Sequence, residues 1–208
     1  MEEIILEKSA IILAGGFSRR FGSDKGLVLL RDKPLVRHVI DKISPVVDEV
    51  LVVVSSENQK KTFELIFKKD VKIIIDKENS QSPLIGAITG FEANNCEYSL
   101  LLPCDAPLVS TKIIQFLFDM SINRRAVIPR WPRGYIEPLQ AVYHTKSALI
   151  AARIALKQDH MNMRSMIDNL QGVRYISTMV IEQLEHRLVT FLNVNTPEDL
   201  KKAESYLK

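Results

Sequence analysis

Short apolar runs recur along the chain and alternate with longer stretches in which apolar and polar residues mix. Several of these runs, beginning with residues 9–13, are continuously apolar or nearly so, which is typical of strands that are buried on both faces. The sequence predicts strands at residues 9–13, 49–54, 71–75, 98–102, 126–128, 139–143 and 188–192.

The stretches between these runs carry apolar residues three or four positions apart, as on the buried face of a helix. The last of them has a clear helix start, because Thr196 can cap it, Pro197 fits its first turn and Asp199 stands at the third position. Helices are predicted at residues 34–43, 59–68, 84–94, 110–121, 145–156, 163–170 and 197–207.

Alternation of strands and helices predicts right-handed crossovers and a parallel sheet. The predicted fold class is therefore α/β, with a single domain over residues 1–208, a mostly parallel central sheet and helices on both faces. In such sheets ligands bind beyond the carboxyl ends of the strands. We therefore expect a site in the loops that follow the first four strands, at residues 14–26, 55–58, 76–83 and 103–107.

The first of these loops carries the strongest signal, because Gly15 and Gly16 come just after a buried strand. Glycines there let the backbone approach a ligand closely, and successive free N–H groups can form a concave anion site. Arg20 and Lys25 add two cations, so the loop suits a polyphosphate. It is neither a Walker A loop nor the dinucleotide fingerprint, because its glycines are adjacent and lack the spacing of both motifs.

Two carboxylates follow the third and fourth strands. Asp76 stands at the end of the third, and Asp105 lies in the turn Pro-Cys-Asp-Ala-Pro, which its prolines stiffen. A fixed carboxylate at a strand end suits Mg²⁺, which takes only one or two protein carboxylates beside phosphate oxygens and waters. Asp105 lies too far upstream of Ser110 to cap the next helix, so we interpret it as the metal ligand.

Composition limits the classes of protein to consider. The 208 residues are 46% hydrophobic and 25% charged, as in a soluble globular protein, and a net charge of +3 is too small to indicate a nucleic-acid partner. Cys96 and Cys104 cannot form a four-cysteine zinc site or a disulfide framework, which favours a reducing compartment. No apolar stretch is long enough to span a membrane and the first residues are acidic, unlike a signal peptide, so we expect a cytoplasmic location.

These motifs, with four others in order along nearly the whole chain, resemble those of the molybdenum cofactor guanylyltransferases, within the Rossmann-like nucleotidyltransferases. The other four are residues 33–35, 83–87, 137–143 and 193–200. The adjacent glycines, the Pro-Cys-Asp-Ala-Pro turn and the Asn-Val-Asn-Thr-Pro ending favour the guanylyl branch. The resemblance implies a Rossmann-like fold, Mg²⁺ as cofactor, and transfer of GMP from GTP to Mo-molybdopterin, which forms the guanine dinucleotide cofactor and releases diphosphate.

In that reaction Lys25 and Arg20 are predicted to neutralise charge on the departing diphosphate, and Asp105 to hold Mg²⁺ against the α-phosphate. No general base is needed, since the attacking phosphate is already ionised. The nucleotide is expected to contact Leu13, Ala14, Gly15, Gly16, Lys25, Asp76 and Asp105.

For the acceptor, Asn193 and Asn195 lie two residues apart after the last predicted strand, where they share one face or simply form a turn. Arg130 lies beside Trp131 in a Pro-rich segment. In one interpretation a planar pterin stacks on the indole; in the other the segment is an ordinary surface loop. Arg164 is a further candidate for the acceptor side.

Two departures from the family pattern leave alternatives open. Ser55 stands where some members have asparagine, and Ser82 precedes Pro83 where glycine is frequent. The alternative enzymes use CTP with molybdopterin, or a sugar-phosphate or corrinoid acceptor; the non-enzyme alternative is a nucleotide-binding regulatory module. Lys25 and Asp105 argue against the module, and diphosphate release would exclude it. Proteins that supply molybdopterin or mature molybdoenzymes are the expected transient partners.

Overall fold

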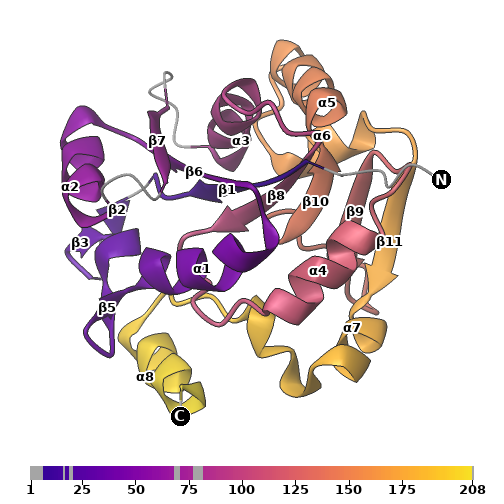
Figure 1. The fold of residues 1–208 in the computed structure, drawn as a ribbon. Helices are drawn as coiled ribbons and strands as arrows, with labels where there is room; N and C mark the ends of the chain where they lie inside the picture. Colours follow the sequence, from indigo (N-terminus) through magenta and orange to yellow (C-terminus); the bar gives the residue numbers. More distant parts are fainter. Residues whose placement is uncertain (1–6, 16, 19–20, 68–70, 77–81, 208) are drawn as a thin grey trace.

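The computed structural model describes residues 7–15, 17–18, 21–67, 71–76 and 82–207 (Figure 1). Its centre is a seven-stranded sheet in the order β11-β9-β10-β8-β1-β6-β7. Only the pairings of β10 with β8 and β9 are antiparallel, so the prediction of a mostly parallel sheet is confirmed. These strands are β1 (Lys8–Leu13), β6 (Glu49–Val54), β7 (Lys72–Ile75), β8 (Tyr98–Pro103), β9 (Ala126–Arg130), β10 (Ala141–His144) and β11 (Val173–Ser177).

Four short strands form two small hairpins between β1 and the first helix: β2 (Phe17–Ser18) pairs with β3 (Ser23–Asp24), and β4 (Leu29–Leu30) pairs with β5 (Lys33–Pro34). The helices are α1 (Leu35–Ile43), α2 (Glu57–Phe67), α3 (Pro83–Glu92), α4 (Thr111–Asp119), α5 (Thr145–Lys157), α6 (Met163–Asp168), α7 (Thr178–Leu184) and α8 (Pro197–Tyr206). Short 3₁₀ turns are η1 (Lys25–Leu27), η2 (Ser44–Val46) and η3 (His186–Phe191).

Helices cover both faces of the sheet, as the sequence predicts. Successive side chains of β1 point to opposite faces, so Ile11 packs in the core under α3, α5 and α6, and Ile12 in the core under α1, α2 and α4. Figure 1 shows α3, α5 and α6 on one side of the sheet and α1, α4 and α7 on the other. A third cluster, which includes Leu30, Val194 and Ala203, holds α8 against the segment between β4 and α1.

The last predicted strand, residues 188–192, is wrong. The chain there forms η3, and Arg187 and Leu188 take positive φ angles of 76° and 49°, which interrupt an extended backbone. Its apolar residues pack singly against neighbouring clusters instead of pairing with a strand. The true edge strand is β11, which the sequence did not reveal because Arg174 and Tyr175 interrupt its apolar pattern.

Within the described residues, no helix has the length and apolar character needed to cross a membrane.

Helix α3 packs closely against β1 in the middle of the sheet, and the missing side chain of Gly90 makes this close approach possible. A Cβ on Gly90 would lie 2.3 Å from the Cγ2 of Ile11, a fully buried side chain of β1. We expect Gly90→Ala to lower the free energy of unfolding by about 1–3 kcal/mol, because overpacking outweighs the better helix propensity of alanine. Urea unfolding measures this change.

Gly86→Ala in the same helix is the matched control. Its Cβ would meet the Leu13 side chain at 3.2 Å, and a terminal methyl group can shift by the few tenths of an ångström required. A Gly90→Ala variant that is as stable as the Gly86→Ala variant would contradict this account of the packing.

Candidate active site

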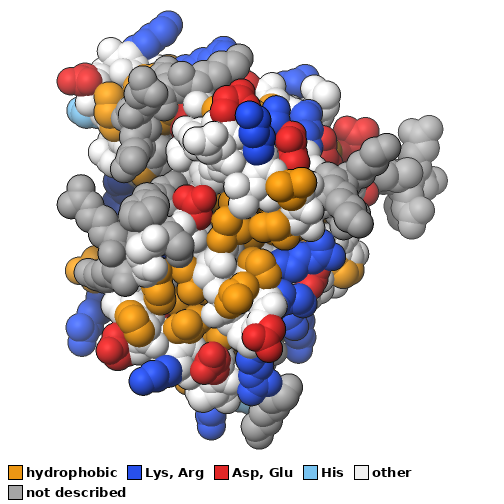
Figure 2. All heavy atoms as spheres, turned by 90° about the vertical axis from the view of Figure 1, so that its left-hand side faces the viewer, with side chains coloured by type: hydrophobic (Ala, Val, Ile, Leu, Met, Phe, Trp, Pro, Cys, Tyr) orange, Lys and Arg blue, Asp and Glu red, His pale blue; other side chains and the backbone are white. Residues whose placement is uncertain are grey.

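Six strands of the central sheet run in one direction, so their carboxyl ends share one edge. The segments after β1, β6, β7 and β8 begin at this edge, where the sequence places the candidate residues. Figure 2 views the molecule from the side on which β2, β3 and β5 lie. Hydrophobic side chains gather in the middle and lower part of this face, with charged side chains around them.

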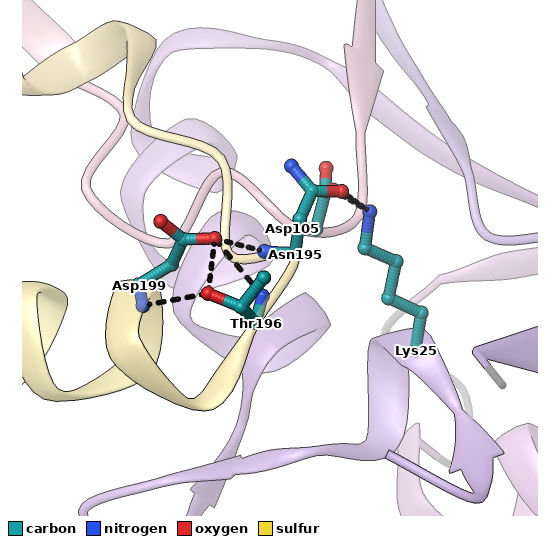
Figure 3. A network of polar contacts seen from close by, with 5 residues as sticks. All are labelled: Lys25, Asp105, Asn195, Thr196 and Asp199. Carbon is teal, nitrogen blue, oxygen red and sulfur yellow. Dashed lines mark hydrogen bonds and ion pairs between the residues drawn. The ribbon is translucent and has the colours of Figure 1, made fainter. Parts of the chain in front are cut away.

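Three side chains from distant parts of the chain meet here (Figure 3). The Nζ of Lys25, at the start of η1, forms an ion pair with Oδ2 of Asp105, which follows β8. The same Nζ donates a hydrogen bond of 2.6 Å to Oδ1 of Asn195, which precedes α8. The Lys25 side chain is 26% exposed and that of Asp105 only 7%, so the pair lies at the rim of the protein interior.

The start of α8 fixes Asn195 in this group. Asp199 accepts hydrogen bonds from the backbone N–H groups of Asn195 and Thr196, at 3.0 and 2.9 Å. The Thr196 hydroxyl also bonds this carboxylate, and these hydrogen bonds lower the pKa of Asp199. The N–H of Val194 donates to the carbonyl of Asp105 at 2.8 Å, so the two segments are joined through the backbone as well. The predicted cap of this helix is confirmed.

Asp105 has the properties that a metal ligand requires. Its Oδ1 is buried and finds no hydrogen-bond partner among the described residues, an arrangement that is costly unless a cation compensates. Ser110 stands at the N-cap position of the helix that follows, so Asp105 does not serve as that cap. No cluster of three or more His, Cys, Asp or Glu side chains lies within the described ranges. A hard cation bound to Asp105 therefore needs phosphate oxygens and waters to complete its shell, which fits Mg²⁺.

The loop after β1 is tied to its neighbours through the backbone. The N–H of Ala14 donates to the carbonyl of Val53 at 2.8 Å, and the carbonyl of Leu13 accepts from Cys104 at 3.1 Å. Gly15 is exposed. Gly16 and Arg20 lie outside the described residues, so their roles stay predictions.

Asp76 follows β7 and lies near α3 and the end of β6. Its Oδ1 accepts a hydrogen bond of 3.0 Å from the hydroxyl of Thr89, and its N–H donates to the carbonyl of Val54. The position of a Cβ on Gly86 would fall 3.2 Å from Leu13 and 3.8 Å from Oδ2 of Asp76. Asp76 is thus held between the first turns of α3 and the ends of β1 and β6.

The candidates for the acceptor separate into two places. Asn193 is exposed two residues before Asn195, while Arg130 and Arg164 line a shallow hollow of about 150 Å³ near Tyr175. The guanidinium of Arg130 lies 5.5 Å from the centre of the Tyr175 ring, and Arg164 pairs with Asp168 at 3.4 Å. Among the described residues, no hydrogen bond or ion pair links this hollow to the group around Asp105.

Trp131 is held by other side chains. Its Nε1 donates to Glu137 at 2.6 Å, and its ring lies 5.7 Å from that of Phe191, edge to face. Burial raises the pKa of Glu137. Burial also raises the pKa of the Cys104 thiol to about 12, which agrees with a packing role for this residue.

One residue of this region carries no signal in the sequence. Gln59, near the start of α2, connects the loop after β1 with the loop after β6 through its buried side chain. A glutamine in an amphipathic helix carries no pattern that would single it out.

The sheet is mostly parallel, a glycine loop follows β1, and a lysine–aspartate pair lies at the carboxyl edge. These features define a Rossmann-like enzyme fold of the kind that binds phosphate groups. The model of the MobA-like NTP transferase domain matches residues 10–173. The chain therefore belongs to this family of nucleotidyltransferases.

Curated relatives of similar sequence are named as nucleotidyltransferases too. A "probable molybdenum cofactor guanylyltransferase" of Natranaerobius thermophilus is 33% identical, and the match covers 96% of each chain. One of Methanosarcina mazei is 31% identical, over 97% of this chain and 92% of the relative.

Solved structures show the same fold. The molybdopterin-guanine dinucleotide biosynthesis protein A of Archaeoglobus fulgidus superposes with a TM-score of 0.79 at 27% identity, covering 95% of this chain and 97% of that one. The 4-diphosphocytidyl-2C-methyl-D-erythritol synthase of Anaerococcus prevotii gives a TM-score of 0.75 at 15% identity, over 97% and 96% of the two chains. The second likeness concerns the fold alone.

Proposed function

We propose that the chain, acting as one domain, transfers GMP from GTP to Mo-molybdopterin with Mg²⁺, and so forms the guanine dinucleotide cofactor and diphosphate. The observation that carries this proposal is the group of Lys25, Asp105 and Asn195 at the carboxyl edge of the sheet. It is supported by relatives that are named guanylyltransferases and that this chain matches over nearly their whole length. Proteins that deliver molybdopterin or receive the product would be its transient partners.

The chemistry needs positioning and charge neutralisation more than proton transfer. An oxygen of the acceptor's phosphate forms a bond to the α-phosphorus of GTP, and the bond from that phosphorus to the oxygen bridging to the β-phosphate breaks. The electron pair leaves with diphosphate. Bound Mg²⁺ supplies charge neutralisation at the α-phosphate, and Asp105 would hold it there.

Lys25 has a second part in this proposal. In the protein without nucleotide its ammonium compensates the buried Asp105 carboxylate. With Mg²⁺ held by Asp105, the Lys25 ammonium would be free to bind the oxygens of the leaving diphosphate, together with Arg20. Asn195 retains its place beside both groups, because the capping hydrogen bonds of α8 hold its backbone. Arg130, Arg164 and Asn193 are the proposed contacts for the acceptor.

We expect Gly15→Ala to leave the fold intact and to weaken nucleotide binding about tenfold or more. Gly15 does not have a positive φ angle, and a Cβ there would lie 3.5 Å from the Cβ of Ser55, an ordinary contact. The methyl group would instead occupy space into which a phosphate approaches the backbone. Calorimetric titration with Mg·GTP, beside a urea unfolding curve, measures both effects. Unchanged affinity in a stable variant would exclude close approach at Gly15.

Nucleotide choice tests the proposal against its alternatives. Guanine presents two donors, N1–H and the N2 amine, beside the O6 acceptor, so a site that pairs all three rejects adenine and cytosine. An unpaired buried polar group costs about 1–3 kcal/mol, which predicts roughly tenfold to several-thousandfold selection of GTP. Competition binding with GTP, ATP and CTP measures it. CTP binding as tightly as GTP would favour the cytidylyl alternative.

A further inference from the structure

The side chain of Gln59 is an amide in the interior that joins two loops of the carboxyl edge. Its Nε2 donates a hydrogen bond of 2.7 Å to the carbonyl of Ala14. Its Oε1 accepts from the backbone N–H of Ser55 at 2.8 Å and from the Ser55 hydroxyl at 3.1 Å. Gln59 is only 4% exposed, so water does not compete for these bonds.

These bonds fix the orientation of the peptide group between Ala14 and Gly15. A peptide bond is planar and trans, so the carbonyl of Ala14 and the N–H of Gly15 point in opposite directions. Because Gln59 holds the carbonyl toward the interior, the N–H of Gly15 faces outward. Gly15 is exposed, and its N–H has no partner within the part of the chain that the structure describes. The other end of the unit is also fixed, since the N–H of Ala14 donates to Val53.

We propose that Gln59 is a positioning residue that presents the Gly15 N–H to an oxygen of the bound nucleoside triphosphate. It acts through the backbone and does not itself touch the nucleotide. This inference rests on the proposed function, because the ligand it serves is the nucleotide of that reaction. The essential group is the amide donor, since the carbonyl of Ala14 requires a donor opposite it.

The test replaces this donor in two ways. Gln59→Glu keeps the shape and the acceptor for Ser55 but sets a carboxylate against the Ala14 carbonyl. Gln59→Met keeps the length and removes both hydrogen-bonding groups. Both variants are expected to raise the KM for GTP, and the Kd for Mg·GTP by calorimetry, about tenfold or more. The kcat, measured by diphosphate release with saturating GTP and Mo-molybdopterin, is expected to stay within about threefold, because Lys25 and Asp105 are unaltered.

Asn94→Asp provides the matched control. Asn94 is also a buried amide, 7% exposed, and it donates to the hydroxyls of Ser9 and Ser99 at 2.6 Å each. These serines lie near the amino ends of β1 and β8, at the opposite edge of the sheet. The same amide-to-acid change there should lower the melting temperature and leave the KM for GTP unchanged.

The binding and kinetic results distinguish a failure of the Gln59 role from a failure of the proposed function. If the unaltered chain binds Mg·GTP and either Gln59 variant binds it equally well, the inference fails and the proposed function stands. If Asn94→Asp raises the KM as much as the Gln59 variants do, the effect is general destabilisation and the inference also fails. If the unaltered chain binds no nucleoside triphosphate, the proposed function fails first. A KM effect confined to the Gln59 variants, with kcat retained, supports the inference.

Discussion

Replacing Asp105 by asparagine is expected to lower the turnover number at least about 100-fold, the scale of losing a key electrostatic contact in a transition state. The amide has the shape of the carboxylate but not its charge, so it binds a hard cation poorly. The fold should persist. Lys25 keeps its hydrogen bond to Asn195, and the cost of burying a carboxylate at 5% exposure disappears.

The measurement is a steady-state rate at saturating GTP, acceptor and Mg²⁺, with a urea unfolding curve of the same preparation. Asp41→Asn is the control, because Asp41 also pairs with cations, Lys33 and Arg37, but is more exposed. That change should leave the rate within about twofold. Near-normal magnesium-dependent turnover of Asp105→Asn would exclude Asp105 as the metal ligand.

Lys25→Ala is expected to reduce kcat by about 100-fold to 1000-fold and to change the affinity for GTP far less. The reason is that negative charge grows on the diphosphate as its bond to the α-phosphorus breaks, so a nearby ammonium stabilises the transition state more than the ground state. The contacts of Lys25 with Asp105 and Asn195 keep this ammonium at the carboxyl edge before the nucleotide arrives.

The comparison of kcat with the Kd for Mg·GTP decides the role of Lys25. A loss of affinity alone would mean that the ammonium binds the ground state and transition state equally, which contradicts a catalytic role. Lys33→Ala is the control, because Lys33 is another lysine in an ion pair with an aspartate, and it should change neither constant.

Much of this architecture follows from the sequence because the strands near the centre of the sheet are buried on both faces. Their short, continuous apolar runs, such as that of β6, are rich in β-branched residues and therefore favour strands over helices. The edge strand β11 pairs on one side only among the described residues and carries polar residues between its apolar ones, so its pattern resembles a loop. Residues 188–192 show the opposite case, because a strand is predicted where none forms. Their apolar side chains suit a strand, but Arg187 just before the segment and Leu188 at its start have left-handed backbone conformations.

The site was predictable where a motif holds its residues in one loop and less so where folding brings distant residues together. The glycine loop and Asp105 stand out because each lies within a few residues of the end of a buried strand. The contact between Lys25 and Asn195 spans 170 positions and depends on the packing of α8, which local patterns do not encode. Gln59 is not predictable for the same reason, since its partners become neighbours only when β1 and β6 pair.

The central claim is the identity of the group transferred and of its acceptor. The most direct measurement incubates the chain with Mg²⁺, Mo-molybdopterin and each nucleoside triphosphate in turn, and determines the product by mass. The account predicts a product that carries one GMP on the molybdopterin phosphate, formed roughly tenfold or more faster than the products from ATP or CTP, and one diphosphate released for each product. A CMP product formed as fast as the GMP product, or no transfer from GTP to Mo-molybdopterin, would contradict it.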